Sequence, residues 1–426
     1  MMGARPSGLV AWAFYDWANS AFPTVIATFV FAAYFTQAVA TDSIAGTAQW
    51  GYAMSASGLA VALLAPLLGA VADHGGRRKP WLAVFTLLCV GMTALLWLTR
   101  PDPADVLWAL VLVGLANVAF EMGMVFYNAM LPDLAPPERI GRWSGWGWGL
   151  GYGGGLACLA LALVGLVQAE TPWFGLDKAQ AEPVRATALL AALWFGLFSL
   201  PLFLLTPDRA GTGLSVAEAT RRGISSLAAT LKRAREYRTA LRFLLAHMIY
   251  TDGLNTLFAF GGVYAAGTFG MDFQELILFG IALNVTAGIG AALFAFADDR
   301  FGPKVVIVVS VAALILLGGA LLAVESKALF WAFGLPLGIF VGPAQAASRS
   351  LMARLAPAEI RAEMFGLYAF SGKATAFLGP ALLGMVTTAF ASQRAGMATI
   401  LVFFAVGLLL LLPVRTMRIG LGGDAS

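Results

Sequence analysis

The stretch Gly69-Ala-Val-Ala-Asp73-His-Gly-Gly76-Arg77-Arg78-Lys79 lies between two apolar runs of the chain. A second polar stretch, Ala295-Phe-Ala-Asp298-Asp299-Arg300-Phe-Gly302-Pro-Lys304, follows the same pattern 226 residues later, with Asp299 in the place of Asp73. Another pair repeats at an offset of 221 residues, as Leu134-Ala-Pro136-Pro-Glu138 and Leu355-Ala-Pro357-Ala-Glu359. Matching polar loops in two hydrophobic halves predict a membrane protein built from two repeats, the architecture of secondary transporters.

The composition supports a place in the lipid bilayer. Hydrophobic residues make up 60% of the chain, charged residues 12%, and the mean hydropathy is +0.81. A soluble domain carries about 25% charged residues. The net charge of +4 is gathered mainly on one side of the predicted membrane, which argues for orientation and against nucleic-acid binding. Cys89 and Cys158 lie inside apolar runs, where packing is expected rather than a disulfide or a metal site.

A transmembrane helix needs about 20 apolar residues, and twelve such runs are present. They are Leu9–Ala38, Trp50–Val71, Trp81–Leu98, Val106–Met130, Trp143–Val167, Thr187–Leu205, Phe243–Ala266, Leu276–Ala297, Val305–Val324, Leu329–Ser348, Phe365–Phe390 and Met397–Val414. The predicted fold is an all-α integral membrane protein of two pseudosymmetric six-helix bundles. Residues 1–206 and 242–426 form the bundles, and residues 207–241 form a basic linker between them.

The basic residues predict the orientation. With an even number of spans both termini lie on one side, and that side then holds 21 of the 27 Lys and Arg residues, against five in the opposite loops. Positive loops remain cytoplasmic, so we expect a multi-pass protein of the cell inner (plasma) membrane with both termini inside. The part of the linker from Ala228 to Tyr237 is either a basic amphipathic helix on the inner membrane surface or a solvated connection.

Five ionisable residues fall inside the predicted spans, namely Asp16, Glu121, His247, Asp252 and Lys373. A charged side chain at a helix centre costs roughly 2.5–3.5 kcal/mol on insertion scales. At 1.5 Å per residue most of these charges lie near the midplane of a hydrocarbon core of about 30 Å. We therefore expect them to converge on a water-filled cavity between the two halves.

Helical spacing extends the candidate site. Asn117, Glu121 and Asn128 share one face of span four, and Asp16 and Asn19 share one face of span one. The pattern Asp16-x-x-Asn19-Ser20 returns as Asp252-x-x-Asn255-Thr256, which predicts a pseudosymmetric pair across the cavity.

Two interpretations of these charges remain open. In the first, Lys373 binds an anionic group of the substrate, while Glu121 and either Asp16 or Asp252 bind its amine or carry a coupling proton. In the second, Glu121 and Lys373 are a buried ion pair that holds the halves together. His247 is a candidate proton relay or a structural residue.

The motif from Gly69 to Lys79 resembles the loop between spans two and three of the major facilitator superfamily. Tyr15-Asp16-Trp17-Ala18-Asn19-Ser20-Ala21-Phe22, Tyr127-Asn128 and Ser371-Gly372-Lys373-Ala374-Thr375 resemble its vacuole-effluxer branch, which includes autophagy-linked amino-acid exporters. The resemblance implies a transporter fold and an amino-acid-like substrate. It also implies an inner-face gate, in which Asp73 lies near the start of span eleven and pairs with Arg77.

The gate set expected from both copies of the loop is Gly69, Asp73, Gly76, Arg77, Arg78, Asp299, Arg300 and Gly302. In the second copy Ala295 replaces the first glycine and Pro303 replaces a basic residue, so this loop departs from the motif. Anchoring by positive charge alone is the alternative for both loops.

The function expected is secondary active transport of a small polar solute by alternating access, coupled to a proton or to sodium. The alternative is a non-transporting scaffold, assembly factor or receptor on the same fold. No HExxH, GxSxG or metal-ligand cluster is present in the sequence, so we expect neither an enzyme nor a metal or cofactor. Gly149-x-Gly151-x-x-Gly154 fits the dinucleotide pattern but lies in an apolar span without a preceding strand. We expect a monomer with a small-molecule substrate and no nucleic-acid partner.

Overall fold

The structure, a computed structural model, describes residues 6–233 and 235–415. Within them, eleven helices are long and apolar enough to cross a membrane. The twelfth, α9 (Arg238–Phe269), is less apolar because it carries His247 and Asp252. Its 32 residues extend about 48 Å at 1.5 Å per residue, more than the roughly 30 Å of a hydrocarbon core. The predicted all-α fold of two six-helix bundles is confirmed.

The N-terminal bundle begins with an irregular first span. It consists of α1 (Pro6–Asn19), η1 (Phe22–Phe29), α2 (Phe31–Tyr34) and η2 (Phe35–Val39). The remaining elements are α3 (Ser43–Gly75), α4 (Lys79–Leu95), η3 (Leu96–Leu98), η4 (Pro103–Asp105), α5 (Val106–Leu134), η5 (Pro137–Arg139), α6 (Ile140–Ala162), η6 (Leu163–Val167), η7 (Trp173–Gly175) and α7 (Glu182–Leu205).

The C-terminal bundle contains a broken span. Its elements after α9 are α10 (Phe273–Phe301), α11 (Pro303–Ala323), α12 (Lys327–Leu355), η8 (Ala358–Ile360), α13 (Arg361–Lys373), α14 (Leu378–Phe390) and α15 (Gln393–Leu411). The sequence predicts one continuous span eleven, whereas the structure divides it into α13 and α14. Pro380 lies in the first turn of α14, where its missing N–H needs no partner, and its ring disfavours a helix that continues from upstream.

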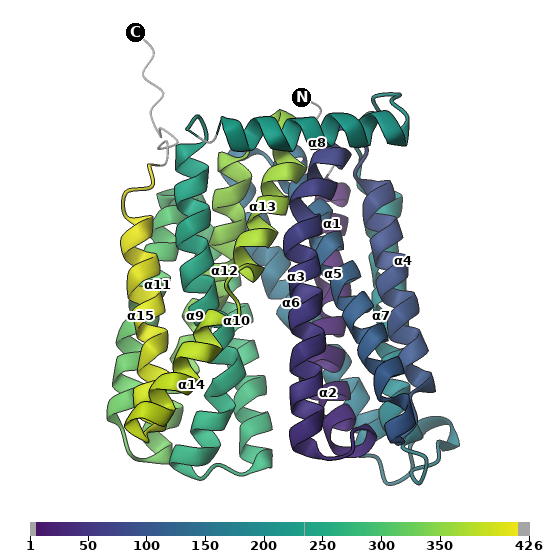
Figure 1. Cartoon of the computed structure of the whole chain (residues 1–426), viewed down its shortest axis with the longest axis vertical. Helices are drawn as coiled ribbons and strands as arrows, with labels where there is room; N and C mark the ends of the chain where they lie inside the picture. The colour runs from purple at the N-terminus through teal and green to yellow at the C-terminus, as the bar shows by residue number, and fades with distance from the viewer. Residues whose placement is uncertain (1–5, 234, 416–426) are drawn as a thin grey trace.

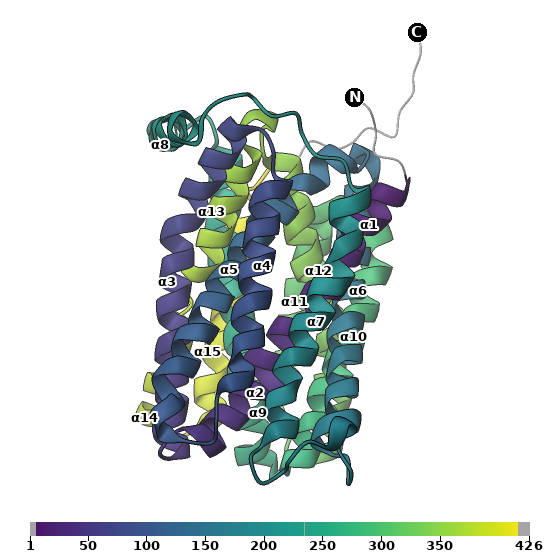
Figure 2. The same ribbon diagram turned by 90° about the vertical axis from the view of Figure 1, so that its right-hand side faces the viewer.

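The linker helix α8 (Val216–Lys232) crosses one end of the molecule, nearly perpendicular to the spans (Figure 1). Figure 2 shows it end-on, outside α3. Its buried residues Ala219, Gly223 and Thr230 share one face, and a Cβ atom on Gly223 would lie 2.8 Å from the Val71 nitrogen of α3. We call this end of the molecule the α8 end and the opposite one the far end.

The structure corrects the position of the linker helix predicted from sequence. One of the two interpretations of the linker places a helix at Ala228–Tyr237, but α8 starts at Val216 and ends at Lys232. The reason is packing, because the small residues that allow contact with α3 lie upstream of the basic cluster.

An aromatic cluster fixes α1 against α5 in the N-terminal core. The rings of Trp12 and Tyr127 stack with centroids 4.6 Å apart, and Trp12 Nε1 donates a hydrogen bond to the Tyr127 carbonyl oxygen at 3.0 Å. The Tyr15 hydroxyl lies 2.7 Å from Thr86 Oγ1 of α4. These buried contacts determine where the following turn of α1, which carries Asp16, is placed.

Candidate functional site

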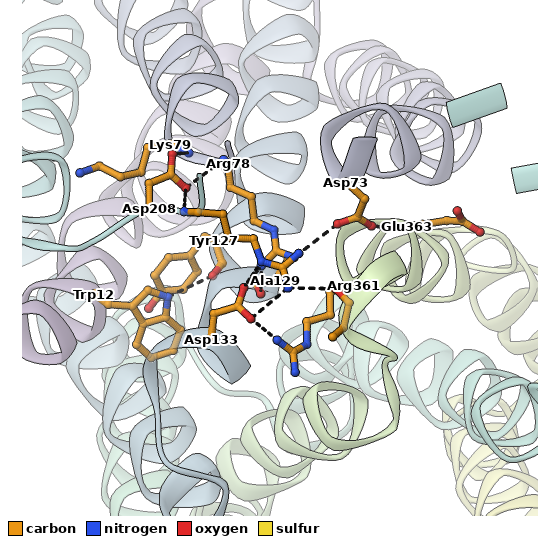
Figure 3. A network of polar contacts seen from close by, with 12 residues as sticks. Trp12, Asp73, Arg78, Lys79, Tyr127, Ala129, Asp133, Asp208, Arg361 and Glu363 are labelled. Atoms are coloured by element: carbon orange, nitrogen blue, oxygen red, sulfur yellow. Dashed lines mark hydrogen bonds and ion pairs between the residues drawn. The ribbon is translucent and has the colours of Figure 1, made fainter. Parts of the chain in front are cut away.

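Asp73, near the end of α3, contacts the first turn of α13 in the opposite bundle (Figure 3). Its Oδ2 accepts a hydrogen bond from the Glu363 backbone nitrogen at 2.9 Å. A carboxylate at a helix N-terminus is stabilised by about 0.3–1 kcal/mol. One turn earlier, Gly69 permits this approach, since a Cβ atom there would overlap the Ala362 carbonyl oxygen. The two bundles therefore meet closely at this point.

Asp299 makes the corresponding contact in the second repeat. It lies near the end of α10 and accepts a hydrogen bond from the Arg142 backbone nitrogen, in the first turn of α6, at 3.2 Å. The glycine that Ala295 replaces is supplied by the partner helix, because Gly145 of α6 packs against Ala295. The departures of the second loop from the motif therefore leave the contact between the bundles in place.

Arg78, rather than Arg77, is the arginine that pairs with Asp73. Arg78 is 1% exposed and contacts Asp73 at 3.3 Å, Asp133 at 2.6 Å and the Ala129 carbonyl oxygen (Figure 3). Arg77 is exposed beside the linker. Gly76 has φ +81°, a conformation that favours glycine and turns the chain so that the second arginine enters the protein. Burial lowers the pKa of Arg78, and the neighbouring carboxylates oppose this shift.

Asp133, at the end of α5, forms ion pairs with two more arginines. Arg361 of α13 forms an ion pair with it across the bundles, and Arg209 of the linker approaches it at 2.9 Å. Arg209 also donates to the Ala358 carbonyl oxygen at 2.9 Å. Charged groups from both bundles and the linker thus close the α8 end.

The other two predicted gate residues make fewer contacts. Arg300 is exposed and stacks over the Phe301 ring at 5.5 Å. Gly302 has φ +89° and shapes the turn between α10 and α11.

Arg349 is the main residue that the sequence does not identify. The sequence ends span ten at Ser348 and counts Arg349 among the loop charges, whereas α12 continues to Leu355 and encloses it at 2% exposure. Its Nη1 pairs with Asp16 Oδ2 across the bundles at 2.9 Å. The sequence does contain a signal for this residue: Gln345 and Arg349 are four residues apart, so two polar side chains share one face of the same helix.

The guanidinium of Arg349 is enclosed by polar and aromatic groups of the N-terminal bundle. It donates to Ser144 Oγ at 2.9 Å, to the Ser144 carbonyl oxygen at 2.6 Å and to Asn128 Oδ1 at 3.4 Å. The rings of Trp12, Tyr127 and Trp148 lie 5.2, 5.7 and 5.7 Å from its central carbon. Since separate charges are costly to bury, this pair favours the arrangement in which the two bundles are in contact at the α8 end.

Asp16 has further partners on its own bundle. The Tyr127 hydroxyl donates to Asp16 Oδ2 at 2.9 Å, and Asn19 Nδ2 lies 3.5 Å from Oδ1. Three predicted site residues, Asp16, Asn19 and Asn128, are therefore brought together around Arg349.

Glu121 and Lys373 form a second ion pair between the bundles, with Oε1 and Nζ 2.7 Å apart. Their side chains are 20% and 29% exposed, so this pair is more open than that of Asp16 and Arg349. Asn117, predicted on the same face as Glu121, instead donates to Ser57 Oγ at 2.8 Å. The pair matches both of the interpretations that the sequence leaves open.

Asp252 and Asp16, although counterparts in the repeat, occupy different environments. Asp252 is 1% exposed, and neither of its carboxylate oxygens has a hydrogen-bond partner among the described residues. Asn255, one turn later, is exposed. His247 Nδ1 lies 2.8 Å from Ser371 Oγ, which ties α9 to α13.

A cavity of about 460 Å³ lies between η1 and α6 of one bundle and helices of the other. Its lining is mainly apolar, with polar groups from Ser20, Thr24, Asn284 and Gln345. Ser20 and Gln345 stand one helical turn from Asp16 and Arg349, so the buried ion pair lies beneath the floor of the cavity. The lining also includes Phe330, in the first turn of α12, so the cavity extends toward the far end.

Comparison with known proteins agrees with this architecture. The family described as "Vacuole effluxer Atg22 like" matches residues 5–142 and 138–419. An uncharacterised MFS-type transporter, YxiO of Bacillus subtilis, is 28% identical over 411 residues, covering 94% of this chain and 93% of its own. Autophagy-related protein 22 of Coccidioides immitis is 23% identical over 448 residues, covering 86% and 71%.

Solved structures show the same fold at low sequence identity. The human organic anion transporter MFSD10 aligns with a TM-score of 0.71 and 15% identity, covering 96% of this chain and 100% of its own. The proton:xylose symporter XylE aligns with a TM-score of 0.74 and 14% identity, covering 96% and 95%. With a family match along nearly the whole chain, this protein belongs to the Atg22-like vacuole effluxer family, and it is a multi-pass membrane protein with the fold of major facilitator superfamily transporters.

Proposed function

We propose that this protein is a secondary active transporter that moves a small polar, amino-acid-like solute by alternating access. The observation that carries the proposal is the asymmetry of the two ends. Ion pairs between the bundles close the α8 end, and the cavity lies directly beyond them toward the far end. Transport requires the reverse arrangement as well, in which these pairs separate and the far end closes.

The Glu121–Lys373 pair is the proposed site for the charged groups of the substrate. An amino-acid-like solute carries a carboxylate for Lys373 and an ammonium group for Glu121. The pair links the two bundles and is partly exposed, so such a solute replaces the internal ion pair without leaving either charge unpaired. Coupling to a proton or to sodium, and residence in the plasma membrane with both termini inside, belong to the same proposal.

A thermal-shift screen of detergent-purified protein tests the substrate class. Amino acids, short peptides and sugars are each added at two pH values, because a ligand that binds the folded protein raises its melting temperature. We expect amino-acid-like compounds to stabilise the wild type and to lose this effect in Glu121→Gln and Lys373→Met. The scaffold alternative predicts that no solute stabilises the protein and that proteoliposomes take none up.

Charge reversal separates the two roles of the ion pair. The double variant Glu121→Lys with Lys373→Glu keeps two opposite charges in contact but exchanges their positions. We expect it to retain the melting temperature of the wild type within a few degrees while uptake falls at least tenfold, because the substrate groups meet the wrong charges. If the pair is only structural, the double variant transports normally although each single variant is destabilised.

A further inference from the structure

The charges embedded in the two bundles do not balance. Asp16 pairs with Arg349 and Glu121 pairs with Lys373. Asp252 remains, 1% exposed and with no hydrogen-bond partner for either carboxylate oxygen among the described residues. An isolated buried carboxylate is costly as an anion, and it avoids this cost by binding a proton or a cation.

The internal repeat explains why Asp252 has no countercharge among the residues that the structure describes. Asp16 and Asp252 begin the same pattern in the two halves. The offset of 221 residues that relates Leu134 to Leu355 also relates Asn128 to Arg349. Arg349, in the C-terminal repeat, pairs with Asp16 of the N-terminal repeat. The equivalent residue of the N-terminal repeat is Asn128, a neutral amide, so it offers Asp252 no positive charge.

The surroundings of Asp252 are small or apolar. Gly379, in the first turn of α14, lies against it: a Cβ atom there would be 2.9 Å from Asp252 Oδ1, and its backbone N–H faces the carboxylate without reaching hydrogen-bond geometry. The Thr256 hydroxyl donates to the backbone carbonyl oxygen of Asp252 at 2.8 Å, so its proton is not directed at the carboxylate. Phe403 and Phe404 of α15 pack beside the neighbouring Gly253. The described residues offer few oxygen atoms for a metal cation, whereas a proton needs one.

The charged and titratable groups on the helices around Asp252 have other partners or lie at helix ends. His247 contacts Ser371, Tyr250 contacts Ser348, and Tyr368 stacks on His247. Lys373 and Arg349 are engaged by carboxylates of the other bundle. The sequence of α14 contains no charged residue. The others lie toward helix ends: Arg238, Arg242 and Tyr264 on α9, Arg361 and Glu363 at the start of α13, Lys327 and Arg354 on α12, Glu275, Asp298, Asp299 and Arg300 on α10, and Arg394 at the start of α15.

We propose that Asp252 is the group that takes up the coupling proton, an inference that rests on the proposed transport function. The proton binds one carboxylate oxygen from the far side, and the resulting neutral carboxyl is tolerated in its buried position. Asp252 adjoins the break between α13 and α14. When the α8 end opens, movement at this break admits water, and the proton leaves to the inner solution.

Infrared spectroscopy tests the protonation without any substrate. We expect the purified wild type at neutral pH to show the carbonyl band of a protonated, buried carboxyl group. The component of this band that comes from Asp252 should be absent from Asp252→Asn, present in Asp252→Glu, and unchanged in the control Glu170→Gln, which alters an exposed acid. Absence of the band from the wild type overturns the proposal, and stabilisation of the wild type but not of Asp252→Asn by sodium would replace the proton with sodium.

Proteoliposomes test the coupling. A pH-sensitive dye inside them reports proton movement when a mixture of L-amino acids is added outside. We expect Asp252→Asn to lower the number of protons moved per amino acid at least tenfold, and Asp252→Glu to restore part of that ratio. Proton flux that persists in Asp252→Asn overturns the coupling role. If the infrared band is present but the wild type transports no amino acid, the proposed function and the coupling both fail, and a protonated structural residue remains.

Discussion

At the scale of single residues, Arg349 determines how the α8 end is closed. Its four hydrogen bonds reach two helices of the opposite bundle as well as Asp16. The planar guanidinium makes these contacts in fixed directions while lying near three aromatic rings. A lysine at this position offers one compact charge and cannot reproduce the arrangement.

The first prediction concerns this residue. Arg349→Met leaves Asp16 without its countercharge, and removal of one partner of a buried ion pair costs about 3–5 kcal/mol. The closed α8 end should therefore open more often. The substitution Ala346→Cys, at a buried position, supplies a reporter thiol, since the native cysteines are buried as well. In Arg349→Met this reporter should react faster with a soluble maleimide added at the α8 side.

The control for this prediction is Arg300→Met. Arg300 is exposed and lies over the Phe301 ring, so the reporter thiol of Ala346→Cys should be labelled at the rate seen without the second substitution. Equal labelling with and without Arg349→Met would show that the Asp16–Arg349 pair does not hold the gate.

At the scale of elements, the contact between α3 and α13 depends on a missing side chain. Gly69→Val places a Cβ atom against the Ala362 carbonyl oxygen, and such overpacking costs typically 1–3 kcal/mol. Because the clash exists only while the bundles touch, we expect the variant to favour the open α8 end and to speed labelling of the Ala346→Cys reporter. Gly58→Val, on the same helix with open space around it, is the matched control. A folded Gly69→Val protein with unchanged labelling argues against this contact as part of the gate.

The linker helix α8 gives a second prediction at this scale. It packs on α3 through Gly223, and its Ser226 hydroxyl donates to Glu363 of α13 at 3.1 Å, so it touches both bundles. Gly223→Leu should lift α8 from this surface. We expect trypsin to cleave after Arg221 and Arg222 about tenfold faster, as a loss of 1–3 kcal/mol of packing implies.

Ala228→Leu, on the exposed face of α8, serves as the control and should leave the cleavage rate near that of the wild type. Cleavage at equal rates in both variants would mean that packing on α3 does not protect the helix.

At the scale of the whole molecule, charge distribution predicts orientation. The α8 end contains the basic linker and both polar loops of the repeat, and positive segments remain on the cytoplasmic side. We expect the thiol of Lys178→Cys, in an exposed far-end loop, to react with an impermeant maleimide on intact cells. The thiol of Ala217→Cys, on the exposed face of α8, should react only after permeabilisation. The reverse pattern would place the linker outside.

Features that depend on residues close together in the sequence could be predicted, and features that depend on distant residues could not. The spans follow from local hydrophobicity, and the division into two repeats follows from the duplicated loops; both are visible in consecutive residues. The helix break after Lys373 could not be predicted from the sequence. A proline is tolerated both in the first turn of a new helix and within a continuous span, and hydropathy does not distinguish these two cases. The choice of Arg78 over Arg77 depends on the turn at Gly76, which the two adjacent arginines alone do not reveal.

The chain by itself thus determined twelve helices, their two-bundle arrangement and the presence of charges within them. The tertiary structure alone decided how those charges pair, because partners such as Asp16 and Arg349 are 333 residues apart. An ion pair forms between two opposite charges only when helix packing places them within a few ångströms of each other. That packing depends on all the helices together. For the same reason only the folded molecule shows that, in the described part of the chain, Asp252 has no countercharge.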